Sequence, residues 1–275
     1  MTALDLRPLT VGEILDRTFT LYRRNFLLFI GITALPQLVA LGVGLTQTFV
    51  VGNTRGFSLT SGLSTIAELL IVFLISLYSE AACFLAVNDL YLGRPATASD
   101  CLRRALQQFA IVFVVWLLTV AAIAAGTICL VIPGIWIACR LFVAIPAALV
   151  EQRSGFDAVT RSWRLTNDNA GRAFVIGLLY MVIAIAAAML FQMPFGIAAF
   201  VYKNDFAVLQ TWSAITQVGQ AIANMVITPI FMIAVSVFYF DLRVRKEGFD
   251  LQMMLDPNSE RSTPPGTGSV PSILA

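Results

Sequence analysis

Residues 130–150, with the sequence LVIPGIWIACRLFVAIPAALV, decide the fold of this chain. Two apolar runs meet at Pro133-Gly134, where proline removes a backbone donor and glycine loosens the chain, so we expect a helix to break there. One charge, Arg140, lies inside the second run. A guanidinium is costly in lipid and usually faces a protein interior or a wet cavity. The stretch therefore predicts a bent helical hairpin in a membrane, with the other segments arranged around it.

The composition of the whole chain predicts the same class of protein. Of its 275 residues, 58% are hydrophobic and 12% are charged, whereas soluble domains carry about 25% charged residues. A soluble chain of this length could not bury so much apolar surface, which favours an all-α, polytopic integral membrane protein. The net charge is only +2, so no basic field indicates a nucleic-acid partner.

The residue types that are missing limit the chemistry. The chain has no histidine, which excludes histidine-based metal sites and Ser-His-Asp triads. None of its four cysteines are spaced as C-x-x-C, so we expect free thiols or small packing residues at Cys83, Cys101, Cys129 and Cys139. No phosphate-binding loop, G-x-S-x-G elbow or metal-ligand cluster occurs. We therefore expect no catalytic residues and no cofactor.

Six apolar segments are long enough to cross a bilayer, whose hydrocarbon core takes about 20 helical residues. The expected spans are residues 26–51, 63–87, 109–132, 134–150, 173–193 and 214–240. The fourth has 17 residues, close to the short limit for a span, and a re-entrant segment is the alternative. Residues 194–212 are expected to form a partly hydrophobic loop.

The chain is expected to form a single helical membrane domain over residues 1–255. Residues 256–275 are rich in Pro, Ser, Gly and Thr and are expected to be a disordered tail. The first apolar run is too long for a signal peptide, is preceded by acidic residues and lacks an obvious cleavage site. We therefore expect it to remain as a membrane span.

Three amphipathic segments that carry arginine precede the three pairs of spans, at residues 10–24, 97–108 and 156–165. In the first of them, Thr10 and Glu13 have the spacing of a capping box, which predicts a helix start. The segments are typical of helices that lie at a membrane surface. For the first segment, a solvated helix packed on the rest of the protein is the alternative.

The three amphipathic segments also resemble one another. Aligned, they contain ILDRTF, CLRRAL and AVTRSW, which place Arg17, Arg104 and Arg161 at one position. One interpretation is three units, each a surface helix followed by a helical hairpin. Convergent amphipathic patterning is the alternative. The three arginines are candidates for contacts with lipid headgroups, and membrane lipids are the expected partners, with other membrane proteins as a further possibility.

Positive charge is distributed very unevenly between the two sides of the predicted spans. Of the 18 Lys and Arg residues, Arg140 lies inside a predicted span, 15 lie in the segments on the side that includes both termini, and only Arg55 and Lys203 lie on the other. The positive-inside rule therefore predicts that both termini are cytoplasmic. The same alternation favours a true span over a re-entrant fourth segment.

Several stretches resemble a family of bacterial multi-span proteins labelled as the membrane domain of glycerophosphoryl diester phosphodiesterase. They are LRPLTVGEILDRTFTLYRRNF, LVIPGIWIACRLFVAIPAALVEQ, FDAVTRSWRLT and YFDLRVRKEGFDL. The resemblance implies a multi-pass protein of the bacterial inner membrane. In fused enzymes of the family, the chemistry belongs to a separate soluble barrel that uses histidines, so the resemblance implies a membrane module without that activity.

The candidate site consists of charges within the predicted spans. Arg140 and Glu68 lie at similar depths, about 10 Å from the arginine-poor side at roughly 1.5 Å per residue, so we expect them to be near each other. Glu80 is deeper and is a third candidate. An ion pair that locks helices is one interpretation, and a site for an anionic headgroup or a transported solute is the other.

The sequence therefore favours a non-catalytic membrane module, either a scaffold or a lipid-interacting accessory. The alternative is a small transporter or lipid-handling protein with a polar intramembrane site around Arg140. A membrane-embedded enzyme that acts on lipid is a third hypothesis. A continuous polar cavity at Arg140 would favour transport, whereas a dry and paired Arg140 would favour the scaffold.

Overall fold

The computed structural model describes residues 8–51, 59–153, 155–202 and 205–247, and all regular elements in these ranges are helices. They are α1 (Val11–Arg24), α2 (Phe26–Thr46), the π-helix η1 (Gln47–Val51), α3 (Leu59–Tyr91), α4 (Ala98–Cys129), α5 (Val131–Arg140), α6 (Ala144–Glu151), α7 (Gly155–Leu165), α8 (Ala170–Val201) and α9 (Phe206–Glu247). The tail predicted for 256–275 lies outside the described residues.

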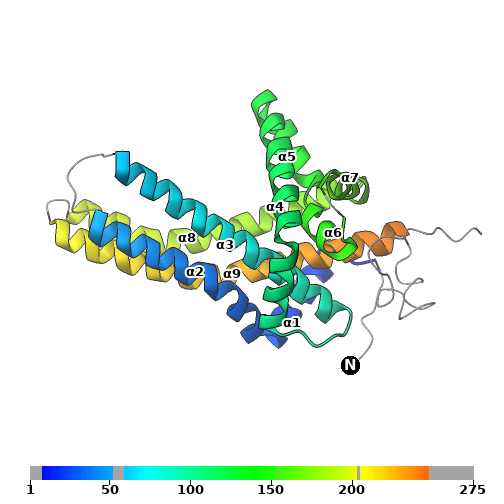
Figure 1. Cartoon of the computed structure of the whole chain (residues 1–275), viewed down its shortest axis with the longest axis horizontal. Coiled ribbons are helices and arrows are strands. Elements are labelled where there is room, and N and C mark those ends of the chain that lie inside the picture. The colour runs from blue at the N-terminus through cyan, green and yellow to red at the C-terminus, as the bar shows by residue number, and fades with distance from the viewer. Residues whose placement is uncertain (1–7, 52–58, 154, 203–204, 248–275) are drawn as a thin grey trace, which may run out of the picture.

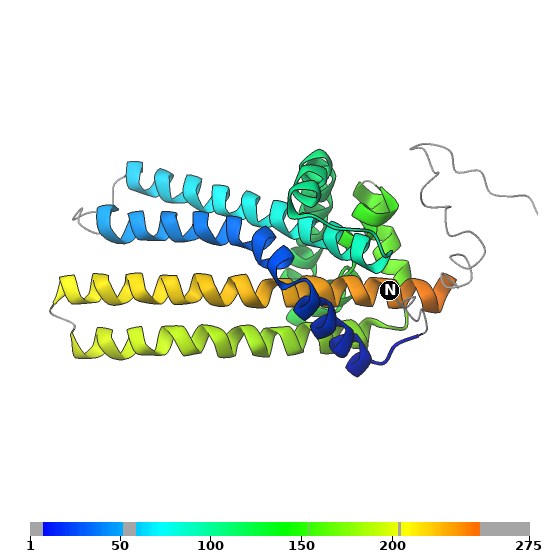
Figure 2. The ribbon, with the colours of Figure 1, turned by 90° about the horizontal axis from the view of Figure 1, so that it is seen from below.

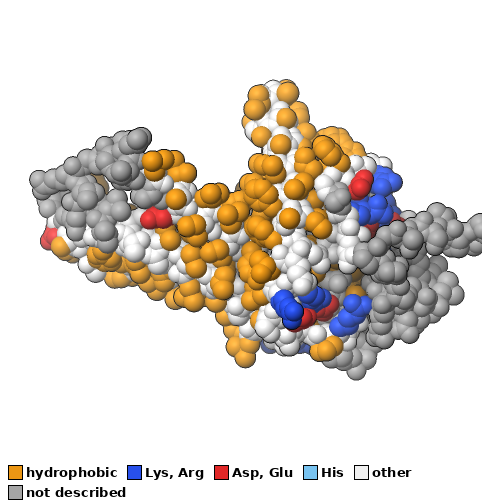
Figure 3. All heavy atoms as spheres, in the orientation of Figure 1, with side chains coloured by type: hydrophobic (Ala, Val, Ile, Leu, Met, Phe, Trp, Pro, Cys, Tyr) orange, Lys and Arg blue, Asp and Glu red, His pale blue; other side chains and the backbone are white. Residues whose placement is uncertain are grey.

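Six stretches of the described residues are long and apolar enough to cross a membrane, as predicted. They are Phe26–Phe49, Thr65–Tyr91, Ala98–Cys129, Val131–Glu151, Ala170–Val201 and Ala207–Glu247. Large apolar side chains along them are exposed, and Figure 3 shows such side chains covering the visible face of the long helices. A surface of this kind is stable only in lipid, so the chain is a multi-pass membrane protein.

Four of the long helices lie side by side as a bundle (Figures 1 and 2). α9 is its central element, because it packs against α2, α3 and α8 and also carries α1. The helices α2 and α8 run from one end of the bundle to the other, and α3 and α9 return (Figure 2). We call the end where α3 and α9 finish the arginine end, and the end where they start the distal end.

The helix α1 confirms the predicted capping box. The Glu13 backbone N–H donates to Thr10 Oγ1 at 3.3 Å, and the Thr10 N–H donates to the Glu13 carboxylate at 2.7 Å. One face of α1 is buried, with Ile14, Thr18 and Tyr22 against the core, and the helix lies along α9. It is therefore packed on the protein, which is the alternative that the sequence left open.

The helices α4 and α5 form a hairpin that stands steeply across the four-helix bundle (Figure 1). α5 returns along α4, and α4 packs at its other end against α3. The apex of the hairpin is apolar and bare, with Ile128 86% and Ile132 80% exposed. The segments of the third and fourth predicted spans are thus helical and apolar, but the hairpin they form does not lie parallel to the other four long helices.

The hairpin turn does not fall at Pro133-Gly134 as predicted. α4 ends at Cys129, Leu130 is extended with φ −166° and ψ 151°, and α5 begins at Val131. Pro133 lies in the first turn of α5, where a missing N–H breaks no helical hydrogen bond. The helix break therefore precedes the proline.

Two further boundaries differ from the predictions. Residues 134–150 do not form one helix, because a turn at residues 141–143 separates α5 from α6. The predicted loop over residues 194–212 is wrong: α8 continues through Pro194 to Val201, and α9 begins at Phe206. Apolar helices tolerate an internal proline in lipid because neighbouring groups compensate for the lost hydrogen bond.

Replacing Gly134 with valine is expected to open the α4–α5 hairpin. A Cβ atom at Gly134 would lie 2.9 Å from Thr127 Cα and 3.0 Å from Thr127 Cβ, so the backbones would have to separate. We expect a loss of about 1–3 kcal/mol in the free energy of unfolding, measured by denaturation in detergent micelles. Gly196→Val is the matched control, because nothing lies within 4 Å of a Cβ atom at Gly196. Equal losses for both variants would contradict this packing.

Candidate functional site

The site is built where a proline interrupts α2. Pro36 has no N–H, so the carbonyl of Ile32, four residues earlier, loses its helical donor. The Ser79 hydroxyl of α3 donates a hydrogen bond to that carbonyl oxygen at 3.0 Å. A hydroxyl of the neighbouring helix thus replaces the missing donor, as is usual for proline in membrane helices.

The same arrangement occurs in α9. Pro229 leaves the Met225 carbonyl without its helical donor. The Thr33 hydroxyl of α2 reaches that oxygen at 3.1 Å and shares its one hydrogen with the Phe29 carbonyl of its own helix, at 3.0 Å. Thr33 itself is buried, with 2% of its surface exposed. The two interrupted turns are therefore joined to neighbouring helices near the middle of the bundle.

A cavity of about 320 Å³ lies at the level of these two prolines. Its wall comes from all four bundle helices and is formed by Thr33, Pro36, Gln37, Ser76, Ser79, Glu80, Cys83, Tyr180, Thr228, Phe231 and Met232. The volume is within the range of about 300–1,000 Å³ that is typical of small-molecule sites. Most of the wall residues carry a hydroxyl, amide or carboxyl group, which is unusual for the interior of an apolar bundle.

Glu80 contributes the single carboxyl group of this wall. Within the described residues it has no hydrogen-bond or ion-pair partner. The rings of Tyr180 and Phe231 lie stacked in the same wall, with their centroids 4.1 Å apart. A carboxylate beside aromatic faces, away from bulk water, is suited to bind a small cation.

Removing the donors at the proline breaks is expected to destabilise the bundle. Ser79→Ala and Thr33→Val each leave a buried carbonyl without a partner, which costs about 1–3 kcal/mol. Thr211→Val is the control, because its exposed hydroxyl donates only within its own helix, to the Ala207 carbonyl. Unfolding in detergent is the measurement. A loss at Thr211 as large as that at Ser79 or Thr33 would contradict the role of these hydroxyls.

Arg140 lies outside this cavity, at the end of α5 beside α7. Its Nη1 donates to Asn167 Oδ1 at 2.8 Å, and its guanidinium carbon lies 4.8 Å and 5.2 Å from the ring centroids of Trp136 and Trp163. Its backbone carbonyl accepts hydrogen bonds from the hydroxyls of Ser162 and Thr166. The guanidinium is therefore engaged by aromatic rings and an amide.

The predicted proximity of Arg140 and Glu68 is not found. Glu68 instead accepts a hydrogen bond from Gln47 Nε2 at 2.6 Å, toward the distal end of the bundle. The prediction counted depth along one straight helix over residues 134–150, whereas the chain turns at residues 141–143 and brings Arg140 to α7. Of the three predicted site residues, only Glu80 lines the mid-bundle cavity.

The three aligned arginines all reach polar partners at helix ends. Arg17 Nη1 donates to the Tyr91 hydroxyl at 3.2 Å. Arg104 forms a bidentate pair with Asp89 near the end of α3. Because of these partners, each guanidinium has fewer N–H groups free to bind lipid headgroups than the sequence indicated.

Arg161 is the third of these arginines, and it links α7 to two other helices. It pairs with Glu151 at 2.8 Å, at the end of α6, and with Glu247 at the end of α9. Burial opposes protonation of Arg161, but the hydrogen bonds to Glu247 and Glu151 outweigh it and raise the pKa of the guanidinium above its usual range. Arg161 therefore stays charged and holds α7 in place.

The order of elements agrees with three units of a surface helix and a helical hairpin. α1 precedes the α2–α3 hairpin, the first turns of α4 lead into the α4–α5 hairpin, and α7 precedes the α8–α9 hairpin. In the second unit the surface helix and the first hairpin helix are continuous. The aligned arginines occupy corresponding places in this order, each in contact with the end of a preceding or neighbouring helix.

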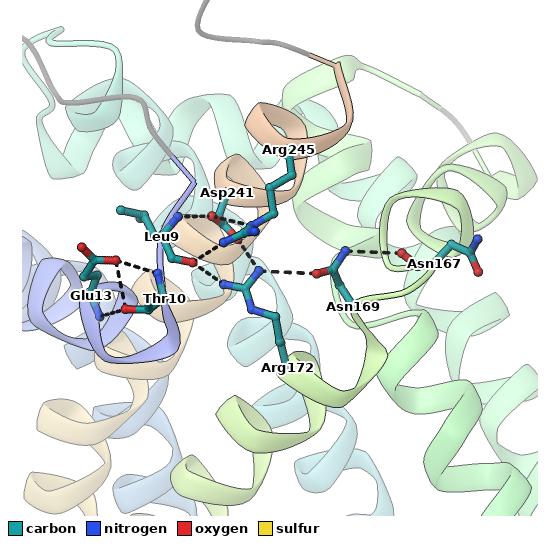
Figure 4. A network of polar contacts seen from close by, with 8 residues as sticks. All are labelled: Leu9, Thr10, Glu13, Asn167, Asn169, Arg172, Asp241 and Arg245. Carbon is teal, nitrogen blue, oxygen red and sulfur yellow. Dashed lines mark hydrogen bonds and ion pairs between the residues drawn. The ribbon is translucent and has the colours of Figure 1, made fainter.

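A second network, around Asp241, closes the arginine end (Figure 4). The Asp241 carboxylate is fully buried and accepts from the Leu9 N–H at 2.6 Å, from Arg172 at 2.7 Å and from Arg245 at 3.0 Å. Both arginines also donate to the Leu9 carbonyl oxygen, at 2.6 Å and 2.5 Å. One carboxylate thus fastens the segment before α1 to α8 and α9.

Asp241 was not among the predicted site residues. An acid directly after an apolar run and near two arginines is nevertheless a sequence signal for a buried ion pair. The described cysteines are free, as predicted. In the described part of the chain, no group of three or more Cys, Asp or Glu side chains is placed to hold a metal ion.

Comparison with known proteins adds no constraint on this site. No family model matches the chain, and searches of curated proteins and of solved structures find no match. The resemblance to the membrane domain of glycerophosphoryl diester phosphodiesterase therefore stays a prediction.

Proposed function

We propose that this chain is a non-catalytic membrane protein that binds a small organic cation in the mid-bundle cavity and carries it across the bilayer. The observation that carries the proposal is Glu80, a carboxyl without a partner in a cavity of about 320 Å³. Unpaired intramembrane charges are costly and usually serve a substrate or ion pathway. The stacked rings of Tyr180 and Phe231 add the aromatic surface that ammonium groups favour.

The proline breaks supply a means of movement. Pro36 and Pro229 interrupt α2 and α9 at the level of the cavity, and interrupted helices commonly form transporter sites. Each break is held by one hydroxyl from another helix, so a change of bend exchanges few contacts. The sequence placed the polar site of the transporter alternative at Arg140, and we place it at Glu80.

A second candidate function is the scaffold or lipid-interacting accessory. It is favoured by the engagement of Arg140 with Asn167, Trp136 and Trp163, and by the ion-pair networks that gather at the arginine end. In this role the cavity would bind nothing. Membrane lipids around the bare α4–α5 hairpin would be the main partners, and other membrane proteins further ones.

The proposed orientation places the arginine end in the cytoplasm of a bacterial inner membrane. The uneven distribution of Lys and Arg supports it, since 15 of the 18 lie in segments on that side. Figure 3 agrees with this distribution, because the blue and red side chains of its visible face gather mostly at the arginine end. A cation bound at Glu80 would then move between the distal end and the cytoplasm.

The test is ligand-dependent stabilisation of the purified protein in detergent. The probes are ethylammonium, choline and the neutral carbon analogue of choline. A ligand at about 100 times its Kd stabilises the folded state by about 2.7 kcal/mol, so a bound cation raises the unfolding temperature in a saturable way. We expect stabilisation by at least one ammonium probe and none by the neutral analogue. Equal effects of all three would refute the proposal and favour the scaffold.

A further inference from the structure

One face of α9 carries a line of polar side chains toward the distal end. Its members recur every three or four positions and therefore lie on one side of the helix, at Gln210, Ser213, Gln217, Gln220, Asn224 and Thr228. The last of them lines the Glu80 cavity. The opposite face of the same helix is apolar and bare, with Ile215 57% and Ile222 56% exposed. We call this line the polar face of α9.

The polar face points into the bundle rather than toward lipid. Gln210 Nε2 donates to the Thr48 carbonyl oxygen at 2.9 Å, and Gln217 Nε2 donates to the Thr48 hydroxyl at 2.8 Å. Thr48 belongs to the π-helix η1, and the residue before it, Gln47, donates to Glu68. The distal part of the polar face therefore adjoins a second intramembrane acid, which is hydrogen-bonded to Gln47 and has no ion-pair partner among the described residues.

Two amide oxygens along this face are buried without partners. Gln217 Oε1 and Gln220 Oε1 have no hydrogen-bond donor in the described protein. Turning either amide over would exchange its oxygen and nitrogen and still leave one polar atom unpaired. An unmet buried polar atom costs about 1–3 kcal/mol, and water is the usual partner where the space is polar.

Gly44 leaves room for one of these amides, that of Gln217. A methyl group at Gly44 of α2 would overlap the Gln217 amide oxygen, whereas nothing lies within 4 Å of a Cβ atom at Gly42. Further along, Gln220 Nε2 donates to Asn224 Oδ1 at 3.3 Å, and Thr228 follows one turn later. Polar groups thus continue from the level of Glu68 to the cavity.

We infer that the polar face of α9 lines a hydrated path by which a cation enters from the distal end and reaches Glu80. Glu68 is its outer carboxylate and Glu80 its inner one, separated by 12 residues of α3, or about 18 Å at roughly 1.5 Å per residue. The unpaired amide oxygens between them are acceptors, which suits hydrated cations and disfavours anions. The direction of entry rests on the proposed function, but the presence of water in the path does not.

The test is the accessibility of single cysteines to a cationic, membrane-impermeant methanethiosulfonate reagent. The four native cysteines are replaced by serine, and Gln217→Cys, Gln220→Cys and Ser213→Cys are introduced one at a time into protein in oriented membrane vesicles. Ser213→Cys is nearly isosteric and keeps the test valid if a glutamine variant does not fold. Ile215→Cys and Ile222→Cys are matched controls on the lipid-facing side of the same helix.

We expect the polar-face cysteines to react at least about ten times faster than both controls, and from the distal side only. Polar-face cysteines as unreactive as the isoleucine controls would overturn the inference. If ammonium probes stabilise the protein but the polar-face cysteines do not react, the cation site at Glu80 is supported and the hydrated path is refuted. If the cysteines react but no ammonium probe stabilises the protein, the hydrated path is supported and the proposed function is refuted.

Discussion

Replacing Asp241 with alanine is expected to lower the free energy of unfolding by about 3–5 kcal/mol. The substitution leaves the guanidinium groups of Arg172 and Arg245 facing each other without their shared carboxylate, and it removes the acceptor of the Leu9 N–H. Removing one partner of a buried network costs more than the network contributes, because the remaining charges stay buried. Chemical unfolding in detergent micelles, together with the yield of folded protein, measures the loss.

Asp168→Asn is the matched control for this prediction, because asparagine removes the charge and tolerates the positive φ of 66° at this position. Its carboxylate is paired with Lys246 at 3.6 Å, but its side chain is 81% exposed, whereas that of Asp241 is 0% exposed. Exposed ion pairs contribute about 0–1 kcal/mol, so the control variant is expected to fold normally. If both variants lost the same stability, the Asp241 network would not be what closes the arginine end.

The second large effect, a loss of ligand affinity, is expected when Glu80 is replaced. Glu80→Gln keeps the shape of the side chain and removes its charge, so we expect the affinity for an ammonium probe to fall by at least about 30-fold, or about 2 kcal/mol. The same variant is expected to be as stable as the parent or more stable without ligand, because an unpaired buried carboxyl is unfavourable. Lost binding with retained stability separates a binding role from a structural one.

Titration of the probe against each variant in detergent, followed by unfolding temperature, measures the effect at Glu80. Asp16→Asn is the control, because it removes a carboxylate on the exposed side of α1 without touching the cavity. Its affinity for the probe is expected to equal that of the parent. A Glu80→Gln protein that binds the probe as tightly as Asp16→Asn does would show that the cation site lies elsewhere.

Most helices of this fold could be predicted from local patterns. Apolar runs of span length locate the six long segments, and Thr10 with Glu13 fixes the start of α1, because both signals depend on residues close in sequence. The amphipathic pattern of residues 156–165 likewise predicts α7. The loop expected at residues 194–212 failed because proline in a membrane helix does not have to end it.

The steep crossing of the α4–α5 hairpin could not be predicted in the same way. Its helices are apolar on all sides toward the apex, so the pattern does not say which face meets a neighbour. The crossing depends instead on contacts between the hairpin and the bundle, such as the hydrogen bond of 2.8 Å that the Tyr78 hydroxyl of α3 donates to the Leu102 carbonyl of α4. No residue in the apolar run indicates the turn at residues 141–143. This turn is the reason why Arg140 and Glu68 are not close to each other.

The candidate site could also be predicted only in part, because its residues are recognisable locally but their proximity is not. Pro36, Glu80 and Pro229 are each conspicuous in the sequence, but nothing local indicates that they lie at the level of one cavity. They come together because α2, α3 and α9 pack at one level, where Ser79 and Thr33 donate to the carbonyls that the prolines leave open. The polar residues along α9 recur every three or four positions, which is a periodic signal in the sequence for an inward-facing polar side of this helix.

The central claim is that a cation occupies the cavity at Glu80, and protection of a cysteine in its wall tests this most directly. Ser76→Cys places a thiol in the wall, and Thr46→Cys, near the end of α2, places one outside it, each in a background without native cysteines. The probe is choline, or the ammonium ion that stabilises the parent protein most. We predict that the saturating cation slows modification at position 76 at least about tenfold and leaves position 46 unchanged. Equal rates at position 76 with and without the cation would contradict the account.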